Sequence, residues 1–193
     1  MSSLSTTDRL KDLLPQLFSE QQRQGNNYLR FQLTKEINVL LDLSYVQESV
    51  TIDSSQITSI PNLPEYVMGL MSSRNQVFLA LDLAHLAGFP PETLNQREYQ
   101  TIVVRVRSGQ NNMQTDEFDL YGLTVKRIQG VSRILPEEFN TSTVVAPDIL
   151  RPFIQGSIQE SHDDSSELQY SFLIDLGRLI NTQITAVNKA SSF

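Results

Sequence analysis

Three short blocks of residues occur twice in this 193-residue chain, in the same order in each half. The first copy holds Leu43–Gln47, Val67–Met71 and Leu81–Leu86, and these match Val125–Gln129, Ile154–Ile158 and Ile174–Leu179 of the second copy. Ordered self-similarity of this kind indicates that a chain is built from two related units. The intervals between blocks differ mainly in loops, where insertions cost little. We therefore expect two related lobes.

Alternation of apolar and polar residues predicts that both lobes are built from strands. From Tyr28 the period is two, with Leu29, Phe31 and Leu33 on one face, which is typical of a half-buried strand. Further short β-rich runs lie at residues 37–43, 45–52, 67–71, 76–81, 100–107, 117–125, 128–134, 153–158 and 168–174. Many short strands at this spacing predict an all-β fold with barrels and only short helices.

The remaining segments set the expected domain boundaries. A helix is expected over residues 5–18, then a polar linker, so that 1–27 precede the folded body. Two further helices are expected to begin after Asp82 and Asp175, whose carboxylates can cap them, and the second is expected to reach Val187. We expect one domain over 28–187, with lobe one at about 28–97 and lobe two at about 98–187, followed by a tail at 188–193.

Composition narrows the range of possible partners and of possible cellular compartments. The chain has no cysteine, and its first residues lack the basic start and apolar run of a secretory signal. No apolar run is long enough for a membrane helix. We therefore expect a cytoplasmic protein without direct membrane insertion. Its net charge of −7 disfavours nucleic acid. The basic pairs Arg105 with Arg107 and Lys126 with Arg127 are expected to be solvated strand faces.

No residue pattern indicates catalysis, a cofactor or a metal. Asp82 and Asp175 directly precede helical patterns, so capping is favoured over acid–base chemistry. The acidic loop Ser161–Glu167 lacks the ligand spacing and turn glycine of a calcium loop, and His85 has neither a cysteine nor a second histidine nearby. Phosphate-binding glycine loops and nucleophile elbows are also missing from the sequence.

The repeated blocks resemble the CheW family of chemotaxis coupling proteins. The resemblance rests on the run from Tyr66 through the turn at Arg74 to Leu83, and in the second half on Tyr121–Ile128, Pro152–Gly156 and Leu173–Leu176. Together these cover nearly all of residues 28–187. The chain looks like a divergent member, because Asn75 stands where the family usually has a turn glycine and Lys126 where it often has an acidic residue. Asparagine tolerates a left-handed backbone, so the turn is expected to survive.

The resemblance implies both a fold and a function. The fold would be two five-stranded barrels of the Src-homology-3 type that share a core and leave a groove between them. The function would be that of an adaptor without enzymatic activity, which binds the regulatory domain of a CheA-type histidine kinase and the cytoplasmic tip of a chemoreceptor. The partner-binding residues would be Val67, Gly69, Arg74 and Asn75. Flagellar chemotaxis, phototaxis and type IV pilus motility stay open as pathways, and a β-barrel ligand-binding protein or enzyme is the alternative.

Overall fold

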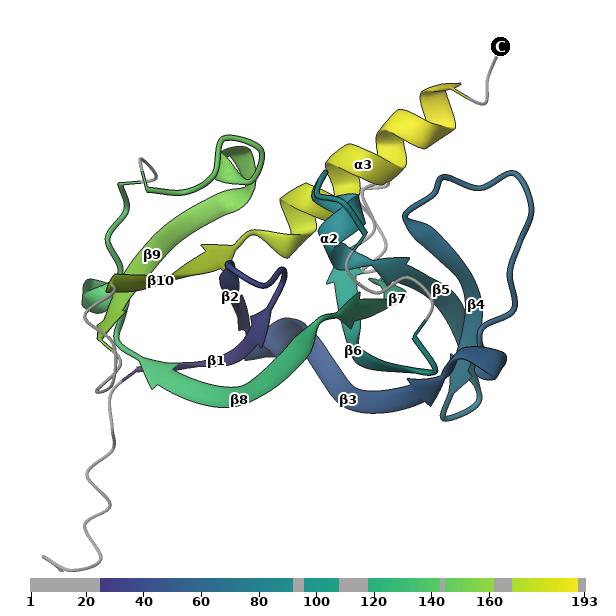
Figure 1. Cartoon of the computed structure of the whole chain (residues 1–193), viewed down its shortest axis with the longest axis horizontal. Helices are drawn as coiled ribbons and strands as arrows, with labels where there is room; N and C mark the ends of the chain where they lie inside the picture. Colours follow the sequence, from purple (N-terminus) through teal and green to yellow (C-terminus); the bar gives the residue numbers. More distant parts are fainter. Residues whose placement is uncertain (1–24, 92–95, 108–117, 143–144, 162–167, 191–193) are drawn as a thin grey trace, which may run out of the picture.

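The computed structural model describes residues 25–91, 96–107, 118–142, 145–161 and 168–190. The expected N-terminal helix and most of its linker, and the acidic loop except Ser161, lie outside the described residues. Within them, ten strands form two five-stranded sheets, as expected for an all-β fold (Figure 1). Sheet A has the order β8 (Arg127–Ile134), β1 (Asn26–Gln32), β2 (Asn38–Asp42), β10 (Leu168–Ile174), β9 (Ile154–Ser161). Sheet B has the order β3 (Val46–Asp53), β6 (Glu98–Arg107), β7 (Phe118–Val125), β5 (Gln76–Asp82), β4 (Val67–Ser73).

The expected division into consecutive lobes is wrong. Residues 28–97 supply β1 and β2 to sheet A but β3, β4 and β5 to sheet B, and residues 98–187 are divided in the same way. Sheet B is therefore continuous in sequence, whereas sheet A joins the first two strands to the last three. The physical reason is the parallel pairing of β2 with β10, in which Leu40 lies opposite Leu173. A hydrophobic period specifies which face of a strand is buried, and it does not specify the neighbouring strand.

The repeated blocks nevertheless occupy equivalent places in the two sheets. Both strand orders coincide when β3, β4, β5, β6 and β7 are matched to β8, β9, β10, β1 and β2. The irregularities coincide too, because Gln47 of β3 and Gln129 of β8 are each the extra residue of a bulge against the neighbouring strand. The two sheets are thus copies of one arrangement, with the chain entering them at different points.

The core lies between the sheets and inside each of them. One large cluster is shared and includes Leu29 and Phe31 of sheet A together with Ile102 and Leu123 of sheet B. Tyr28 is also buried, with 4% of its surface exposed, on the opposite face of β1 from Leu29. Its ring packs edge-on against Phe139, with the ring centroids 5.2 Å apart, inside a smaller cluster of sheet A. The strand is therefore buried on both faces at this point and not on one, because one face lines its own sheet's core and the other the shared core.

Both predicted aspartate caps are confirmed, and both caps start a helix. Asp82 accepts a hydrogen bond from the His85 amide at 3.0 Å and begins α2 (Leu83–Leu86). Asp175 accepts one from the Arg178 amide at 2.9 Å beside the start of α3 (Leu176–Ala190), which continues past the expected end at Val187. The two helices contact each other and pack on the shared core (Figure 1). Neither of the helices that the structure describes is long and apolar enough to cross a membrane.

Candidate protein-interaction site

The hairpin that joins β4 to β5 presents two of the four predicted partner-binding residues at its tip. Ser73 pairs with Gln76, so Arg74 and Asn75 form a two-residue loop. Their φ angles are 46° and 64°. Positive φ at both central residues is the pattern of a type I′ turn, whose twist matches that of the flanking strands. The expected tolerance of Asn75 for a left-handed backbone is confirmed, and Arg74 adopts the same region without being glycine or asparagine.

Glu48 of β3 holds this tip in place. Its Oε2 lies 2.8 Å from Nε of Arg74, and its Oε1 accepts a hydrogen bond from the Ser73 hydroxyl. Strands β3 and β4 are the two opposite edges of sheet B. These contacts therefore join the edges of the sheet and help to close it into a barrel. Glu48 directly follows the bulge residue Gln47, and bulges commonly redirect the side chains beside them.

The tip remains open to solvent despite this ion pair. The Arg74 side chain is 77% exposed, whereas that of Glu48 is only 14% exposed. Val77, the second residue of β5, is exposed to 67% beside the turn. The tip thus combines a planar cation anchored through one nitrogen with an uncovered apolar side chain. The sequence indicated Arg74 as a turn residue but gave no indication of Glu48 or Val77, because a glutamate or a valine on an alternating strand carries no signal of this role.

The other two predicted residues lie at the far end of β4 from the tip. Gly69 sits at a bulge with φ of 148°, and a Cβ added there would come within 2.3 Å of the Thr58 carbonyl oxygen. A glycine inside a strand is typical of a bulge or of a close backbone approach, and Gly69 shows both. Val67 is partly buried and packs against the shared core. The structure therefore brings Arg74 and Asn75 together and places Val67 and Gly69 in a supporting part of the strand.

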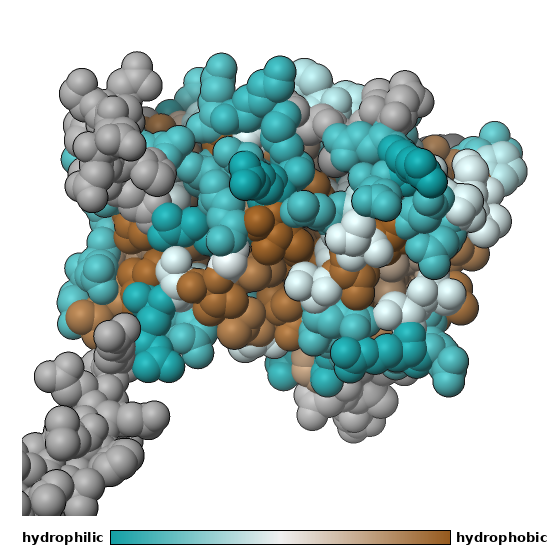
Figure 2. Space-filling model, turned by 60° about the horizontal axis from the view of Figure 1, so that its bottom comes forward, coloured by the Kyte–Doolittle hydropathy of each residue, from teal (hydrophilic) through white to brown (hydrophobic). Residues whose placement is uncertain are grey.

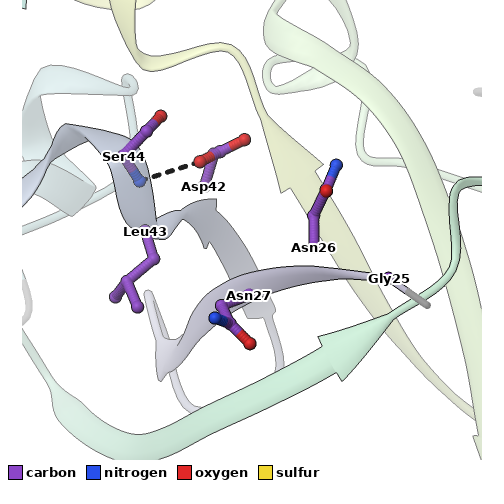
Figure 3. Close-up of a pocket in the computed structure, with 6 residues that line it drawn as sticks. All are labelled: Gly25, Asn26, Asn27, Asp42, Leu43 and Ser44. Carbon is purple, nitrogen blue, oxygen red and sulfur yellow. Dashed lines mark hydrogen bonds between the residues drawn. The ribbon is translucent and has the colours of Figure 1, made fainter. Parts of the chain in front are cut away.

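Two open hollows flank the segment that crosses from sheet A to sheet B. The first, of about 530 Å³, is lined by Gly25, Asn26, Asn27, Asp42, Leu43 and Ser44, with the Ser44 amide donating to Asp42 (Figure 3). The second, of about 440 Å³, is lined by Ser44, Tyr45, Val46, Gln47, Arg105, Arg107 and Phe118. Burial raises the pKa of the Tyr45 phenol, and the charges of Asp175 and Asp42 raise it further. Tyr45 therefore lines the second hollow as a neutral side chain up to alkaline pH.

An apolar area lies on one face of the molecule. Figure 2 shows apolar side chains gathered in the middle of this face, with hydrophilic side chains on either side. The strands along this side of the molecule are β8 and β3 (Figure 1). Val131 of β8 is 57% exposed. An exposed apolar area with a polar border is typical of a surface that binds another protein.

The other polar residues singled out in the sequence do not gather into one site. Nε2 of His85 lies 3.8 Å from Oε2 of Glu65, whose side chain is 92% exposed. Among the residues that the structure describes, no group of three or more histidine, aspartate or glutamate side chains is placed to hold a metal ion. Asp82 and Asp175 are occupied as helix caps.

The family model described as CheW-like domain matches residues 27–183. Among solved structures, the chain is similar to the scaffolding protein TtCheW from Thermoanaerobacter tengcongensis, with 22% sequence identity and a TM-score of 0.59. That match covers 80% of this chain and 92% of the other. No curated protein matches the sequence.

Proposed function

Because this chain belongs to the CheW-like domain family, we propose that it is a non-enzymatic adaptor that couples chemoreceptors of the methyl-accepting type to a CheA-type histidine kinase. It binds the regulatory domain of the kinase and the cytoplasmic tip of the receptor, and it needs no cofactor. It acts in the cytoplasm and reaches receptor arrays through these partners. The observation that carries the proposal is the family match, which spans strands of both sheets.

We place one partner contact at the tip of the β4–β5 hairpin. The exposed guanidinium of Arg74 pairs there with a carboxylate of the partner, a geometry that arginine favours because its nitrogens form a planar fork. Val77 adds an apolar contact beside it. Asn75 sets the turn that presents both residues. In this proposal Gly69 and Val67 keep β4 in position, the first through its bulge and the second through its packing on the core.

Isothermal titration calorimetry tests the proposal with the kinase regulatory domain and a receptor-tip fragment from the same organism. The variants are Arg74→Ala and Val77→Asp. Two matched controls lie in the connection between β8 and β9: Arg151→Ala removes an arginine that is also ion-paired, at 2.6 Å from Asp148, and Val145→Asp charges a valine that is 47% exposed. Val67→Asp is a poor probe, since a charge at this partly buried position would disturb the core.

We expect wild-type protein to bind at micromolar concentration and Arg74→Ala and Val77→Asp to lose about tenfold in affinity. The controls should bind within about twofold of wild type. If the wild-type protein bound neither the kinase domain nor the receptor tip, the adaptor function would be refuted. Equal losses in the Arg151→Ala and Val145→Asp controls would instead move the contact away from the hairpin. The identity of the kinase that binds distinguishes flagellar, phototaxis and pilus systems.

A further inference from the structure

The apolar face of the shared core reaches the solvent at β8, one edge of sheet A. Val131 of β8 lies opposite Leu29 of β1, which lies opposite Leu41 of β2. Residues directly opposite each other point to the same face of a sheet, so the three side chains form one row. Leu29 and Leu41 belong to the shared core and are 5% and 0% exposed, whereas Val131 is 57% exposed. The last apolar residue of this row is therefore left uncovered at the edge.

The outer side of β8 is open within the part of the chain that the structure describes. Two other edge strands are bridged to loop residues, β4 through Leu70 and Thr58, and β9 through Ser157 and Asn140. Strand β8 has no such bridge to another described segment. A Cβ added at Gly130, next to Val131, would meet nothing within 4 Å. An open edge strand with an exposed apolar side chain is a surface on which another segment can pack.

The sequence ahead of the described fold offers an apolar segment of this kind. A helix is expected over residues 5–18, bent at Pro15, and such a helix would carry an apolar stripe made of Leu10, Leu13, Leu14, Leu17 and Phe18. Residues 1–24 contain three acidic and three basic side chains, so the net charge of −7 on the whole chain does not repel them. An amphipathic helix of this type binds by placing its apolar side on an apolar surface.

The point where this segment joins the fold puts the β8 edge within its reach. Asn26 pairs with Ile134, the last residue of β8, and Val131 lies three residues, or about 10 Å, further along the strand. The seven residues from Phe18 to Gly25 span at most about 25 Å. A short tether gives an effective concentration on the order of 1 mM, so a contact with a Kd of about 0.1 mM between separate molecules would be about 90% occupied within one chain. A second copy of the protein at micromolar concentration would not compete.

We propose that residues 5–18 fold back on their own chain and cover the β8 edge, with the apolar stripe against Val131 and Ile128. Ile128 lies opposite Phe31 on the same face as Val131, and it is only partly buried against the shared core. The contact does not depend on the adaptor function, because it involves this chain alone. Another protein that binds at this edge would have to displace the segment.

Tryptophan fluorescence of the full-length protein tests the proposal. The chain has no tryptophan, so Phe18→Trp places a single reporter in the segment. Two further changes, each made in the Phe18→Trp protein, disrupt the contact from opposite sides. Leu13→Asp/Leu17→Asp charges the apolar stripe, and Val131→Asp charges the β8 edge. Circular dichroism and thermal unfolding check that every variant is folded.

Matched controls carry the same charges at other positions. Gln16→Asp/Ser19→Asp adds two carboxylates to polar positions of the segment, and Val77→Asp charges another strand valine, which is 67% exposed. We expect acrylamide to quench the reporter at least about threefold more efficiently in both disrupting variants than in the Phe18→Trp protein, because the segment is then undocked. The controls should stay within about 1.5-fold of the Phe18→Trp protein, and tenfold dilution should change nothing, because the contact is intramolecular.

Three results would overturn the proposal. The first is quenching of the Phe18→Trp protein that is as efficient as in the Leu13→Asp/Leu17→Asp variant, since the segment would then be undocked from the start. The second is an effect of Val77→Asp as large as that of Val131→Asp, which would mean that the segment does not select the β8 edge. The third is quenching that becomes more efficient on dilution, which would identify a second copy as the occupant.

Discussion

Nε of Arg74 and Oε2 of Glu48 lie 2.8 Å apart and connect the two edge strands of sheet B. One partner is at a hairpin tip and the other follows a bulge, so neither is buried in the shared core. The pair therefore links sheet closure to the position of the residue that we propose as a partner contact. An exposed ion pair contributes little to stability, but this one restrains two segments that backbone hydrogen bonds do not join.

A double-mutant cycle measures this restraint. Glu48→Gln keeps an acceptor for the Ser73 hydroxyl and removes the charge that faces Arg74. With Arg74→Ala as the second change, we expect a coupling free energy of about 0.5 to 1 kcal/mol by urea unfolding. The pair Arg151 and Asp148 joins residues three apart in one loop, and it should give a smaller coupling, about 0.3 kcal/mol. Equal coupling in both pairs would show that joining the sheet edges adds nothing.

The turn at Asn75 responds to the backbone preference of its residue. Asn75→Gly should raise the free energy of unfolding by about 0.5 kcal/mol, because glycine has no Cβ penalty at φ of 64°. Asn75→Val should lower it by about 1 to 2 kcal/mol, because a β-branched residue is strained there. Gln76→Val, at the adjacent strand position, is the control and should change stability by less than about 0.5 kcal/mol, the range of surface substitutions. Thermal unfolding of the three variants measures these differences, and a neutral Asn75→Val would contradict the turn assignment.

Substitutions at two glycines with positive φ distinguish the cost of a close contact from the cost of backbone strain. A Cβ at Gly69 would lie 2.3 Å from the Thr58 carbonyl oxygen, whereas one at Gly130 would meet nothing within 4 Å. Gly69→Ala should therefore cost about 3 kcal/mol or more, and Gly130→Ala about 1 kcal/mol from its φ alone. Urea unfolding measures both losses as shifts of the midpoint concentration, provided that the slope of the unfolding free energy against urea concentration stays unchanged. Similar losses for the two variants would mean that Thr58 can move away at little cost.

Tyr121 makes the fold sensitive to alkaline pH. Burial, with a smaller effect of the Asp119 charge, raises its pKa to about 12 from 10.0. The folded state then retains the phenolic proton over a range in which the unfolded chain has lost it, so this stabilisation is complete below pH 10 and disappears as the pH rises to 12. Between about pH 9 and 11.5, Tyr121→Phe should lose less stability than wild type, by on the order of 1 kcal/mol. Parallel pH profiles of the two proteins would disprove this assignment.

Local sequence signals predicted the helices and strands well, but they did not predict which strands lie next to each other in a sheet. The alternation after Tyr28 predicts β1, and Asp82 and Asp175 predict the starts of α2 and α3, because alternation and capping depend on adjacent residues. Sheet partners depend on contacts between distant segments, so the pairing of β2 with β10 and the mixed origin of sheet A were not predicted.

The candidate sites show the same division. The turn residues Arg74 and Asn75 were predicted because a turn is local. Glu48 was not, because its role arises only when β3 and β4 meet as opposite edges. The pairing of Arg105 with Phe118 likewise requires the register of β6 against β7. Side chains that act across a sheet have no signature in the residues beside them.

The order of strands in sheet A has a consequence for synthesis on the ribosome. All five strands of sheet B have been made when residue 125 emerges, so its pairings can form while the rest of the chain is still being translated. Strands β1 and β2 emerge before any strand of sheet B, yet β2 must wait for β10, which follows all the other strands in the sequence, to supply its parallel neighbour. Strand β2 is thus translated before all of sheet B and completes its pairing after it, with an apolar strand uncovered in the interval. Nascent chains of this protein would be most vulnerable to aggregation and proteolysis during that wait.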